Sequence, residues 1–484
     1  MNTADDFVKG IVPIDSFGFL TNILLLGLPP ALLAIWGSWR SAEFAKRQAG
    51  WLASAAAAIA FFGLLFAYLR LAPFETRPLI GMIGMGIALL LVLLTEAFSR
   101  RTNHDEEASA SAAFAVGAVS TLSLSLAIAI SLGWLPLAFS LTALGVAAVY
   151  IARPITIISW LALAAGILAG IALWFNMPLQ YPNVSSTLIF NGLIILLGVP
   201  ALCMIFAGEL LRFTNQGSVE LPANALTAIG LAVFGLFIAV EVVHVVNNGD
   251  LVNARQSLAE TSGHALASLF LAFGLRRLAK SSGQTVFTYA SLTASAISVA
   301  IIALGLLVAF NPFFDGGSVG TGLFFNLLLP AYLLTGLTAA GIALYSRGNS
   351  PRWYTLMYAG LSGVLLFTFA SLSLRKVFQG EKLASYLTTS DLEFWLYSPL
   401  WLGLGAIILT VGLRYNSLVI RAASGILIML TILKVFLLDM SELEGFLRAI
   451  SFIGLGLSLI VVGRFYQRLL TRTANSEKTE AQKA

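Results

Sequence analysis

Two titratable side chains share one face of an apolar segment near the middle of the chain. Glu241 and His244 lie three residues apart in AVEVVHVV (239–246), a spacing that places both on the same side of a helix. His264 opens the next apolar segment, and Asp250 lies in the loop between the two. A carboxylate and two imidazoles can bind a metal ion, and Glu241, His244 and Asp250 can relay a proton. The alternative is a hydrogen-bonded polar cluster that closes a helix end.

Three amides recur in a similar setting along the chain. Each follows a lead-in of small and polar residues and precedes an apolar run that contains proline. Amides in membrane segments commonly hydrogen-bond across helices, and the alternative is that they line a cavity. We therefore treat them, with Glu241, His244 and His264, as candidates for contact with a substrate or ion. The three amides are Asn22, Asn191 and Asn326.

Carboxylates also gather in DMSELEGFLR (439–448), between two strongly apolar segments. The free N–H groups and the dipole of a helix that starts here favour negative charge. A lysine lies about one turn before the stretch, and an arginine ends it. We expect an ion-paired clasp that closes a hairpin, with ligand or ion binding and catalysis as alternatives. Its expected members are Lys434, Asp439, Glu442, Glu444 and Arg448.

The composition defines the kind of element that must position these residues. Only 11% of the 484 residues are Asp, Glu, Lys or Arg, and 58% are hydrophobic. The mean hydropathy is +0.90. A water-soluble protein of this size could not bury so much apolar surface, so the sequence predicts a polytopic membrane protein in the lipid bilayer.

Apolar runs of about 20 residues are long enough to cross the hydrocarbon layer. We count fifteen and therefore expect an all-α polytopic transmembrane helical bundle of about fifteen helices. The division between the fourth and fifth runs is the least distinct, and the ninth run is short. The runs occupy about 17–36, 50–70, 79–98, 111–131, 133–152, 155–176, 187–208, 224–246, 262–279, 285–310, 321–345, 353–374, 392–413, 418–438 and 446–468.

The basic residues predict an orientation. With fifteen spans the termini lie on opposite sides, and the side that holds the C-terminus receives nineteen of the 28 Lys and Arg residues. Positive charge concentrates on the cytoplasmic side, so we expect a multi-pass bacterial inner-membrane protein with its N-terminus outside and its C-terminus in the cytoplasm. The first span is interpreted as a retained helix rather than a cleaved signal. The net charge of +5 forms no nucleic-acid patch, so we expect no nucleic-acid partner.

The three asparagine segments predict an internal repeat. They are followed 78, 85 and 88 residues later by Arg100, Arg276 and Arg414, each at the end of an apolar run. An even number of spans separates successive asparagines, which is typical of parallel repeats. The expected division is 1–180 with six helices, 181–315 with four, 316–470 with five, and a disordered cytoplasmic tail at 471–484.

The last two units also share a polar loop after their second helix. These loops begin in HVVNNGDLV (244–252) and RKVFQGEKL (375–383). The third unit thus carries Arg375 and Lys376 where the second carries its histidine, which excludes a metal site common to both units.

The sequence lacks the common sequence motifs of nucleotide-binding, hydrolytic, metal-dependent and redox enzymes. It contains no Walker loop, nucleophile elbow, His-Glu-x-x-His or Cys-x-x-Cys motif, and its single cysteine, Cys203, lies in an apolar run. We expect no cofactor, no metal and no disulfide, and an enzyme is the less favoured class.

The C-terminal region TILKVFLLDMSELEGFLRAISFIGLGLSLIVVGRFYQRLL (431–470) resembles a large family of bacterial membrane proteins, domain of unknown function 2339. Its members commonly end in a Lys-Val-Phe, an Asp, a Leu-Glu-Gly, an Arg, a Ser-Phe and a Tyr-Gln-Arg. The segment from Glu393 to GLRY and the NPFF before the third asparagine are also similar. The resemblance is specific over about 390–470 and looser back to about 180. The corresponding residues are Lys434, Val435, Phe436, Asp439, Leu443, Glu444, Gly445, Arg448, Ser451, Phe452, Tyr466, Gln467 and Arg468.

The resemblance implies a polytopic membrane protein and brings no established activity. From the residues we favour a carrier or conduit for a small or amphipathic cell-envelope substrate, driven by an ion gradient if at all. The alternatives are a membrane-embedded enzyme acting on a lipid-linked envelope substrate and a membrane assembly scaffold. An envelope lipid or glycan is the substrate class considered, and the sequence leaves the oligomeric state open.

Overall fold

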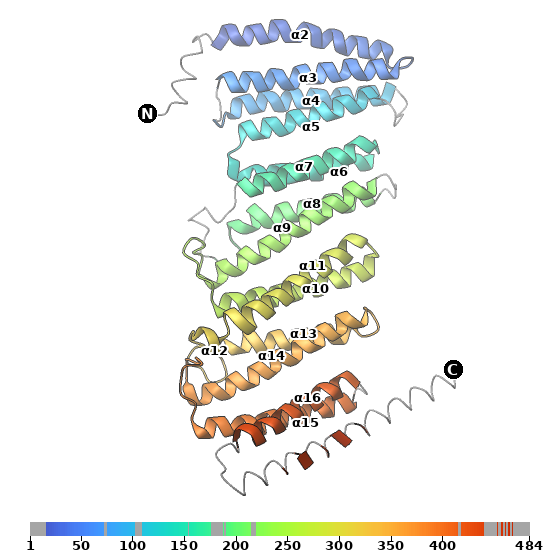
Figure 1. The fold of residues 1–484 in the computed structure, drawn as a ribbon. Coiled ribbons are helices and arrows are strands. Elements are labelled where there is room, and N and C mark those ends of the chain that lie inside the picture. The colour runs from blue at the N-terminus through green and yellow to red at the C-terminus, as the bar shows by residue number, and fades with distance from the viewer. Residues whose placement is uncertain are drawn as a thin grey trace, which may run out of the picture. The chain divides into compact units, whose positions relative to one another are not determined.

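A computed structural model shows an all-helical chain (Figure 1). Fourteen helices in the described part are long and apolar enough to cross a membrane. The described residues are 16–71, 75–101, 109–152, 154–175, 187, 190–213, 219–414 and 418–439, with isolated positions at 453, 456, 457, 460, 463, 464 and 467. Within them the only pairing of extended backbone is an isolated bridge between Ser318 and Lys382.

The chain forms two compact units. The first comprises 1–255 and 282–290, and the second comprises 256–281 and 291–484. In the first unit α2 packs on α3, α4 and α3 on α5, α6 on α7, and α8 on both α6 and α9. Its elements are α2 (Ser16–Ser41), α3 (Lys46–Leu71), α4 (Pro78–Arg101), α5 (Ser109–Ala129), η1 (Leu132–Trp134), α6 (Leu135–Ala152), α7 (Thr156–Phe175), η3 (Ile194–Gly198), α8 (Val199–Arg212) and α9 (Glu220–Val246).

In the second unit α13 packs on α14, and α15 packs on α14 and α16. Helix α11 (Thr285–Ala300) starts in the first unit and ends in the second. The other elements are α10 (Leu258–Ser282), η5 (Ile301–Ala309), α12 (Pro312–Asp315), η6 (Leu329–Leu334), α13 (Thr335–Ser346), α14 (Arg352–Gln379), α15 (Asp391–Arg414), α16 (Leu418–Lys434) and η7 (Val435–Asp439).

Small residues bring α8 and α9 into close contact. A Cβ atom on Gly208 would meet the Ala223 carbonyl oxygen at 2.7 Å, and one on Gly230 would meet that of Ala201 at 2.9 Å. Both distances are too short for a side chain, so the two backbones approach as closely as glycine permits. Membrane helices have little hydrophobic drive to associate with one another, and such small-residue contacts supply van der Waals packing instead. This packing fixes the register between α8 and α9.

Hydroxyl groups tie α11 to α14 inside the second unit. The Tyr354 hydroxyl lies 3.0 Å from Ser295 Oγ, and the Tyr358 hydroxyl lies 3.5 Å from Ser298 Oγ. All four residues are buried. Polar side chains that hydrogen-bond each other hold membrane helices together because lipid offers no alternative partner.

In the part of the chain that the structure describes, four segments adopt the wider π-helical turn, namely η3, η5, η6 and η7. Such turns release carbonyl groups, which neighbouring side chains must satisfy inside a membrane. The Tyr332 hydroxyl in η6 donates to the Leu306 carbonyl in η5 at 2.7 Å, and Thr335 Oγ1 donates to the Pro330 carbonyl at 2.8 Å. The interruptions are therefore supported by packed neighbours.

The prediction of an all-α polytopic bundle is confirmed, and the first fourteen apolar runs each correspond to one of the fourteen helices. The division between the fourth and fifth runs is present as α5 and α6. The ninth run is longer than expected, because α10 continues through a polar first turn and a basic last turn. The fifteenth run, 446–468, lies almost wholly outside the described residues. The internal repeat and its boundaries stay predictions.

Candidate functional site

The first half of the site is Asn191, which precedes the helical turns of η3 and α8. Its Oδ1 accepts a hydrogen bond from the Leu193 backbone N–H at 2.8 Å. This is the contact of a helix-capping side chain, because the first N–H groups of a helix have no backbone partner. The expected apolar run starts at 187, yet the helical backbone starts after the amide. Asn191 therefore stands at a helix end and not inside a span.

The second half of the site lies on α9, near its C-terminal end. Asn191 Nδ2 lies 2.9 and 3.1 Å from the two carboxylate oxygens of Glu241 and 3.2 Å from His244 Nδ1. His244 Nδ1 lies 3.8 Å from Glu241 Oε1. The His244 side chain is only 1% exposed and that of Glu241 is 15% exposed. The structure therefore brings together three of the residues that the sequence singled out.

We call Asn191, Glu241 and His244 the Asn191 cluster. Both Glu241 and His244 face the side-chain amide nitrogen of Asn191. The amide of Asn191 carries two protons and faces two carboxylate oxygens and His244 Nδ1. Nδ1 accepts only in the tautomer that carries the ring proton on Nε2, and in that tautomer the amide cannot donate at full strength to all three atoms. A proton added to His244 Nδ1 would turn that atom from acceptor to donor. It would then be attracted to the Glu241 carboxylate, whose Oε1 lies 3.8 Å away. The bonding within the cluster therefore depends on which ring nitrogen of His244 carries the proton.

Asp250 is engaged elsewhere. Its Oδ1 accepts from the Asn253 and Val252 backbone N–H groups at 2.9 and 3.1 Å, and its Oδ2 accepts from Asn253 Nδ2 at 3.0 Å. The hydrogen bonds from the Asn253 backbone and side chain hold the pKa of the Asp250 carboxyl below its ordinary value. Asp250 shapes the loop after α9, and its hydrogen bonds there do not involve Glu241 or His244.

His264 belongs to the second unit, whereas the Asn191 cluster belongs to the first. His264 Nε2 lies 3.7 Å from Glu260 Oε1, one turn earlier on α10. The Glu260 side chain is 7% exposed. Sequence reasoning missed Glu260, although a carboxylate at i and a histidine at i+4 in an apolar helix was a readable signal.

A second polar centre, also missed as a pair, joins α14 to α15. The side chains of Arg375 and Glu393 are 3% and 0% exposed, and Arg375 Nη1 donates to Glu393 Oε1 at 2.9 Å. Glu393 also accepts from Gln379 Nε2 at 2.8 Å and from the Tyr397 hydroxyl at 3.2 Å. A buried ion pair is tolerated only when such bonds satisfy the remaining polar atoms. We call Arg375, Gln379, Glu393 and Tyr397 the Arg375 cluster.

The loop between α14 and α15 closes around this arginine. Arg375 donates to the backbone carbonyls of Leu383, Ala384 and Leu387 at 2.8, 2.7 and 3.2 Å, and to Thr389 Oγ1 at 3.2 Å. With the bond to Glu393 these contacts use all five N–H donors of the guanidinium group. The neighbouring Lys376 donates to the Gly320 carbonyl. The arginine therefore organises its own loop.

The other two amides differ from Asn191. Asn326 Oδ1 also accepts from a backbone N–H two residues on, that of Leu328, at 2.9 Å. Its Nδ2, however, donates to the carbonyls of Leu323 and Gly322 at 2.9 and 3.1 Å, within its own loop. Asn22 lies inside α2 and is exposed. Only Asn191 contacts titratable side chains among the bonds of these three amides.

Lys434 is the described part of the expected clasp. It is 8% exposed, and its Nζ donates to the Phe394 carbonyl and to Ser398 Oγ, both at 2.9 Å. The same Nζ lies 4.1 Å from the centre of the Phe394 ring. The side chain of Asp439, together with Glu442, Glu444 and Arg448, lies outside the described residues, so the clasp stays a prediction.

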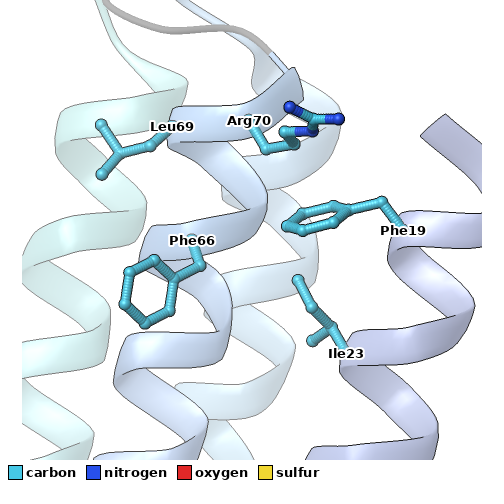
Figure 2. A pocket seen from close by; sticks show the side chains of 5 residues that line it. All are labelled: Phe19, Ile23, Phe66, Leu69 and Arg70. Carbon is cyan, nitrogen blue, oxygen red and sulfur yellow. The ribbon is translucent and has the colours of Figure 1, made fainter. Parts of the chain in front are cut away.

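The metal hypothesis gains no site among the described residues. Within the described ranges, no group of three or more His, Cys, Asp or Glu side chains could hold a metal ion. An open groove of about 380 Å³ lies between α2 and α3 (Figure 2). None of the candidate residues lines it.

Fold and clusters together define a polytopic α-helical membrane protein with ionisable groups buried in its spans. The chain belongs to the family described as "Predicted membrane protein (DUF2339)", whose model matches residues 14–469. The match covers nearly the whole chain and so extends well beyond the C-terminal region that carries the resemblance in the sequence. No curated protein and no solved structure matches the chain.

Proposed function

We propose that the protein is a carrier or conduit for a small or amphipathic cell-envelope substrate, and that the Asn191 cluster couples it to protons. The observation that supports this is the burial of His244 beside a partly buried Glu241, 3.8 Å away, within an apolar helix. Ionisable side chains are costly in a membrane segment, and where they persist they commonly serve ion or proton pathways.

The arrangement favours coupling over simple helix packing for a chemical reason. A packing contact between α8 and α9 needs one amide and one acceptor, whereas here a single amide serves a carboxylate and an imidazole. Protonation would release the amide from His244 and draw the imidazole toward Glu241. Because Asn191 also accepts from the Leu193 N–H, this exchange would act directly on the start of the π-helical turn. A local proton could thus bias the conformation of α8.

Proton flux in proteoliposomes tests the proposal. The purified chain is reconstituted in vesicles of phosphatidylethanolamine and phosphatidylglycerol, and an internal fluorescent pH indicator follows the decay of an imposed pH gradient. We expect faster decay than in protein-free vesicles, and Glu241→Gln should return the rate to the protein-free level. The matched control is Glu220→Gln, which neutralises an exposed carboxylate at the opposite end of the same helix and should leave the flux unchanged.

Two results would contradict the proposal. Equal decay of the pH gradient with and without the parent protein would exclude a conduit for protons. Equal decay in the parent and in Glu241→Gln would show that the Asn191 cluster takes no part in proton movement. Both variants are compared at equal amounts of folded protein, measured by size-exclusion chromatography in detergent. A scaffold or an enzyme on lipid-linked substrates predicts the first of these results.

We propose the inner membrane of a bacterium as the location, with the N-terminus outside and the C-terminus in the cytoplasm. The bias of Lys and Arg supports this orientation. Single cysteines in the 380–390 loop, in a Cys203→Ser background, should react with an impermeant thiol reagent added outside intact spheroplasts. Cysteines at 278–282 should not react, and the reverse pattern would overturn the orientation.

We also propose that the second and third repeat units predicted from the sequence, 181–315 and 316–470, are parallel repeats. Asn191 and Asn326 both accept from the N–H two residues on, and each precedes a π-helical turn. Asn22 shares neither feature, so the first repeat unit, 1–180, would be the most divergent. An experimental structure in which the α8–α9 and α13–α14 hairpins fail to superpose would contradict the repeat.

A further inference from the structure

Basic side chains gather in the second unit where α10 ends and α14 begins. Arg276, Arg277 and Lys280 lie in the last two turns of α10, and Arg352 is the first residue of α14. We call these four residues the basic cluster. In the part of the chain that the structure describes, no carboxylate forms an ion pair with any of them. Their positive charge is therefore available to an external anion.

Arginines at a helix end of the first unit differ in this respect. Arg100 and Arg101 close α4, and each lies beside a carboxylate: Arg100 pairs with Glu96 at 2.6 Å and Arg101 with Glu43 at 3.2 Å. The basic cluster occupies a comparable place, at the end of a membrane-spanning helix, without such partners. Its charge thus distinguishes it from an ordinary ion-paired helix end.

The turn between α13 and α14 holds two of the cations in place. Arg276 Nε and Nη2 both lie 3.2 Å from Ser350 Oγ, and the Arg276 guanidinium carbon lies 5.3 Å from the centre of the Tyr354 ring. One helical turn later, Lys280 Nζ donates to Asn349 Oδ1 at 2.7 Å. Among the described residues these contacts leave Arg276 Nη1 and two of the three ammonium protons of Lys280 without an acceptor. Two oriented cations therefore retain free donors.

Apolar side chains next to the basic cluster indicate its depth in the membrane. Trp353 follows Arg352 and is 56% exposed, and its ring packs edge-to-face on Tyr354 with the ring centres 5.7 Å apart. Leu356, one turn further along α14, is 45% exposed. Exposed tryptophan is typical of the head-group level of a bilayer. The cluster therefore lies where phosphate groups of lipids are found, with an apolar surface beside it.

We propose that the basic cluster binds the phosphate of one anionic phospholipid through Arg276, Lys280 and Arg352, with the acyl chains beside Trp353 and Leu356. A guanidinium group matches the geometry of a phosphate, and an ammonium group adds a point charge. Basic pockets between membrane helices bind lipid head groups in this way. Cations that are only hydrated would show no preference between lipids. The inference is independent of the proton site and of the proposed orientation.

Lipid titration of the full chain in detergent tests the site. Phosphatidylglycerol and phosphatidylcholine with identical acyl chains are added separately, and native mass spectrometry measures the occupancy of the first bound lipid. The parent should bind phosphatidylglycerol in preference to phosphatidylcholine. Loss of one charge-assisted contact should weaken phosphatidylglycerol binding by about tenfold in Lys280→Gln. Equal binding of the two lipids by the parent would overturn the proposal.

Arg100→Gln is the matched control for charge. Arg100 also lies in the last turn of a membrane-spanning helix, and its side chain is 70% exposed and paired with Glu96. The variant removes the same charge from a helix end that is already balanced, so it should bind phosphatidylglycerol like the parent. Equal weakening in Lys280→Gln and Arg100→Gln would assign the effect to net charge and overturn the site.

Two further variants separate charge from structure. Lys280→Arg retains the charge and should retain the preference for phosphatidylglycerol, whereas Arg352→Gln should weaken it. Because Lys280 and Arg352 are exposed, these variants remain informative if Arg276→Gln fails to fold. Loss of the preference in Lys280→Arg as complete as in Lys280→Gln would show that the contact with Asn349, and not the charge, is responsible. That result would overturn the proposal.

Soluble glycerol phosphate distinguishes a lipid from a free phosphate. It carries the same phosphate chemistry without acyl chains, and it is added to the complex of the parent with phosphatidylglycerol. At equal concentration it should leave the lipid bound, because it cannot use the apolar surface at Trp353 and Leu356. Displacement of the lipid at equal concentration would assign the site to a free phosphate and overturn the lipid.

Discussion

The C-terminal ends of α9 and α14 present two buried polar clusters of opposite character. At α14, the Arg375 cluster combines one cation and one anion, and every N–H of the guanidinium group has an acceptor. At α9, the Asn191 cluster combines a carboxylate and an imidazole around one amide. The guanidinium group of the first is saturated, whereas the bonding of the second depends on the tautomer of His244.

This difference in bonding suits the two clusters to different roles. A saturated, neutral pair holds a loop in place and gains nothing from an added proton or ligand. A cluster with competing acceptors can respond to one. Burial alone therefore does not identify a functional residue, because Glu393 is more deeply buried than Glu241. The described contacts of the two carboxylates differ in kind: an arginine, an amide and a phenol at Glu393, and an amide and an imidazole at Glu241.

The largest expected effect on stability is that of Arg375→Met. Removal of the guanidinium group strands the Glu393 carboxylate in the interior and frees three loop carbonyls. Breaking a buried pair from one side costs about 3–5 kcal/mol, so the melting temperature in detergent should fall sharply. The double variant Arg375→Met, Glu393→Leu should recover part of the loss. Additive losses in the double variant would show that the two residues are not coupled.

Lys434→Met should have a smaller effect. The described contacts of Lys434 are a carbonyl, a hydroxyl and an aromatic ring, all of which would lose the cation. Unsatisfied buried acceptors cost about 1–3 kcal/mol, and thermal melting should place this variant between the parent and Arg375→Met. A loss as large as that of Arg375→Met would indicate a charged partner, as the clasp hypothesis with Asp439 requires.

The two capping amides should lose similar stability but differ in function. Asn191→Ala and Asn326→Ala each remove one cap, which costs about 1 kcal/mol. Only Asn191→Ala also disturbs Glu241 and His244, so it alone should abolish the proton flux. A flux that falls equally in both variants would indicate a general loss of structure.

Asp250→Asn should have the smallest effect, and that effect should depend on pH. The hydrogen bonds from Asn253 lower the pKa of Asp250 in the folded protein. A lowered folded-state pKa stabilises the protein above the unfolded-state pKa and is lost as the pH falls through the folded-state value. The parent should therefore be slightly more stable than the variant at pH 7, and this difference in stability should shrink as the pH falls. Melting curves from pH 7 to pH 3 measure it, and a gap that widens toward acid would contradict this assignment.

The sequence allowed the membrane spans to be predicted well but allowed less of the site to be predicted. Runs of apolar residues determine where helices cross, so all fourteen described helices follow from hydropathy. Asn191 was placed inside a span because its apolar neighbours mask the helix start. The approach of Asn191 to Glu241, fifty residues later, depends on the register that Gly208 and Gly230 permit.

The pair of Arg375 and Glu393 shows a second limit. Each residue was visible in the sequence, and Arg375 was compared with the end of α9. Their contact arises only because the loop after α14 folds back and supplies carbonyls to the guanidinium group. Such tertiary closure leaves no periodic signal. Glu260, by contrast, was missed although its spacing to His264 was readable.

The most direct test of the central claim is the thermal melting of Glu241→Gln and Glu393→Gln in the same detergent. Both variants make the same isosteric change at a carboxylate near a helix end. We expect Glu393→Gln to lower the melting temperature clearly, because Arg375 loses its counter-charge, and Glu241→Gln to melt close to the parent. A loss in Glu241→Gln as large as that in Glu393→Gln would show that the Asn191 cluster also holds the fold together, and would overturn the distinction between the two clusters.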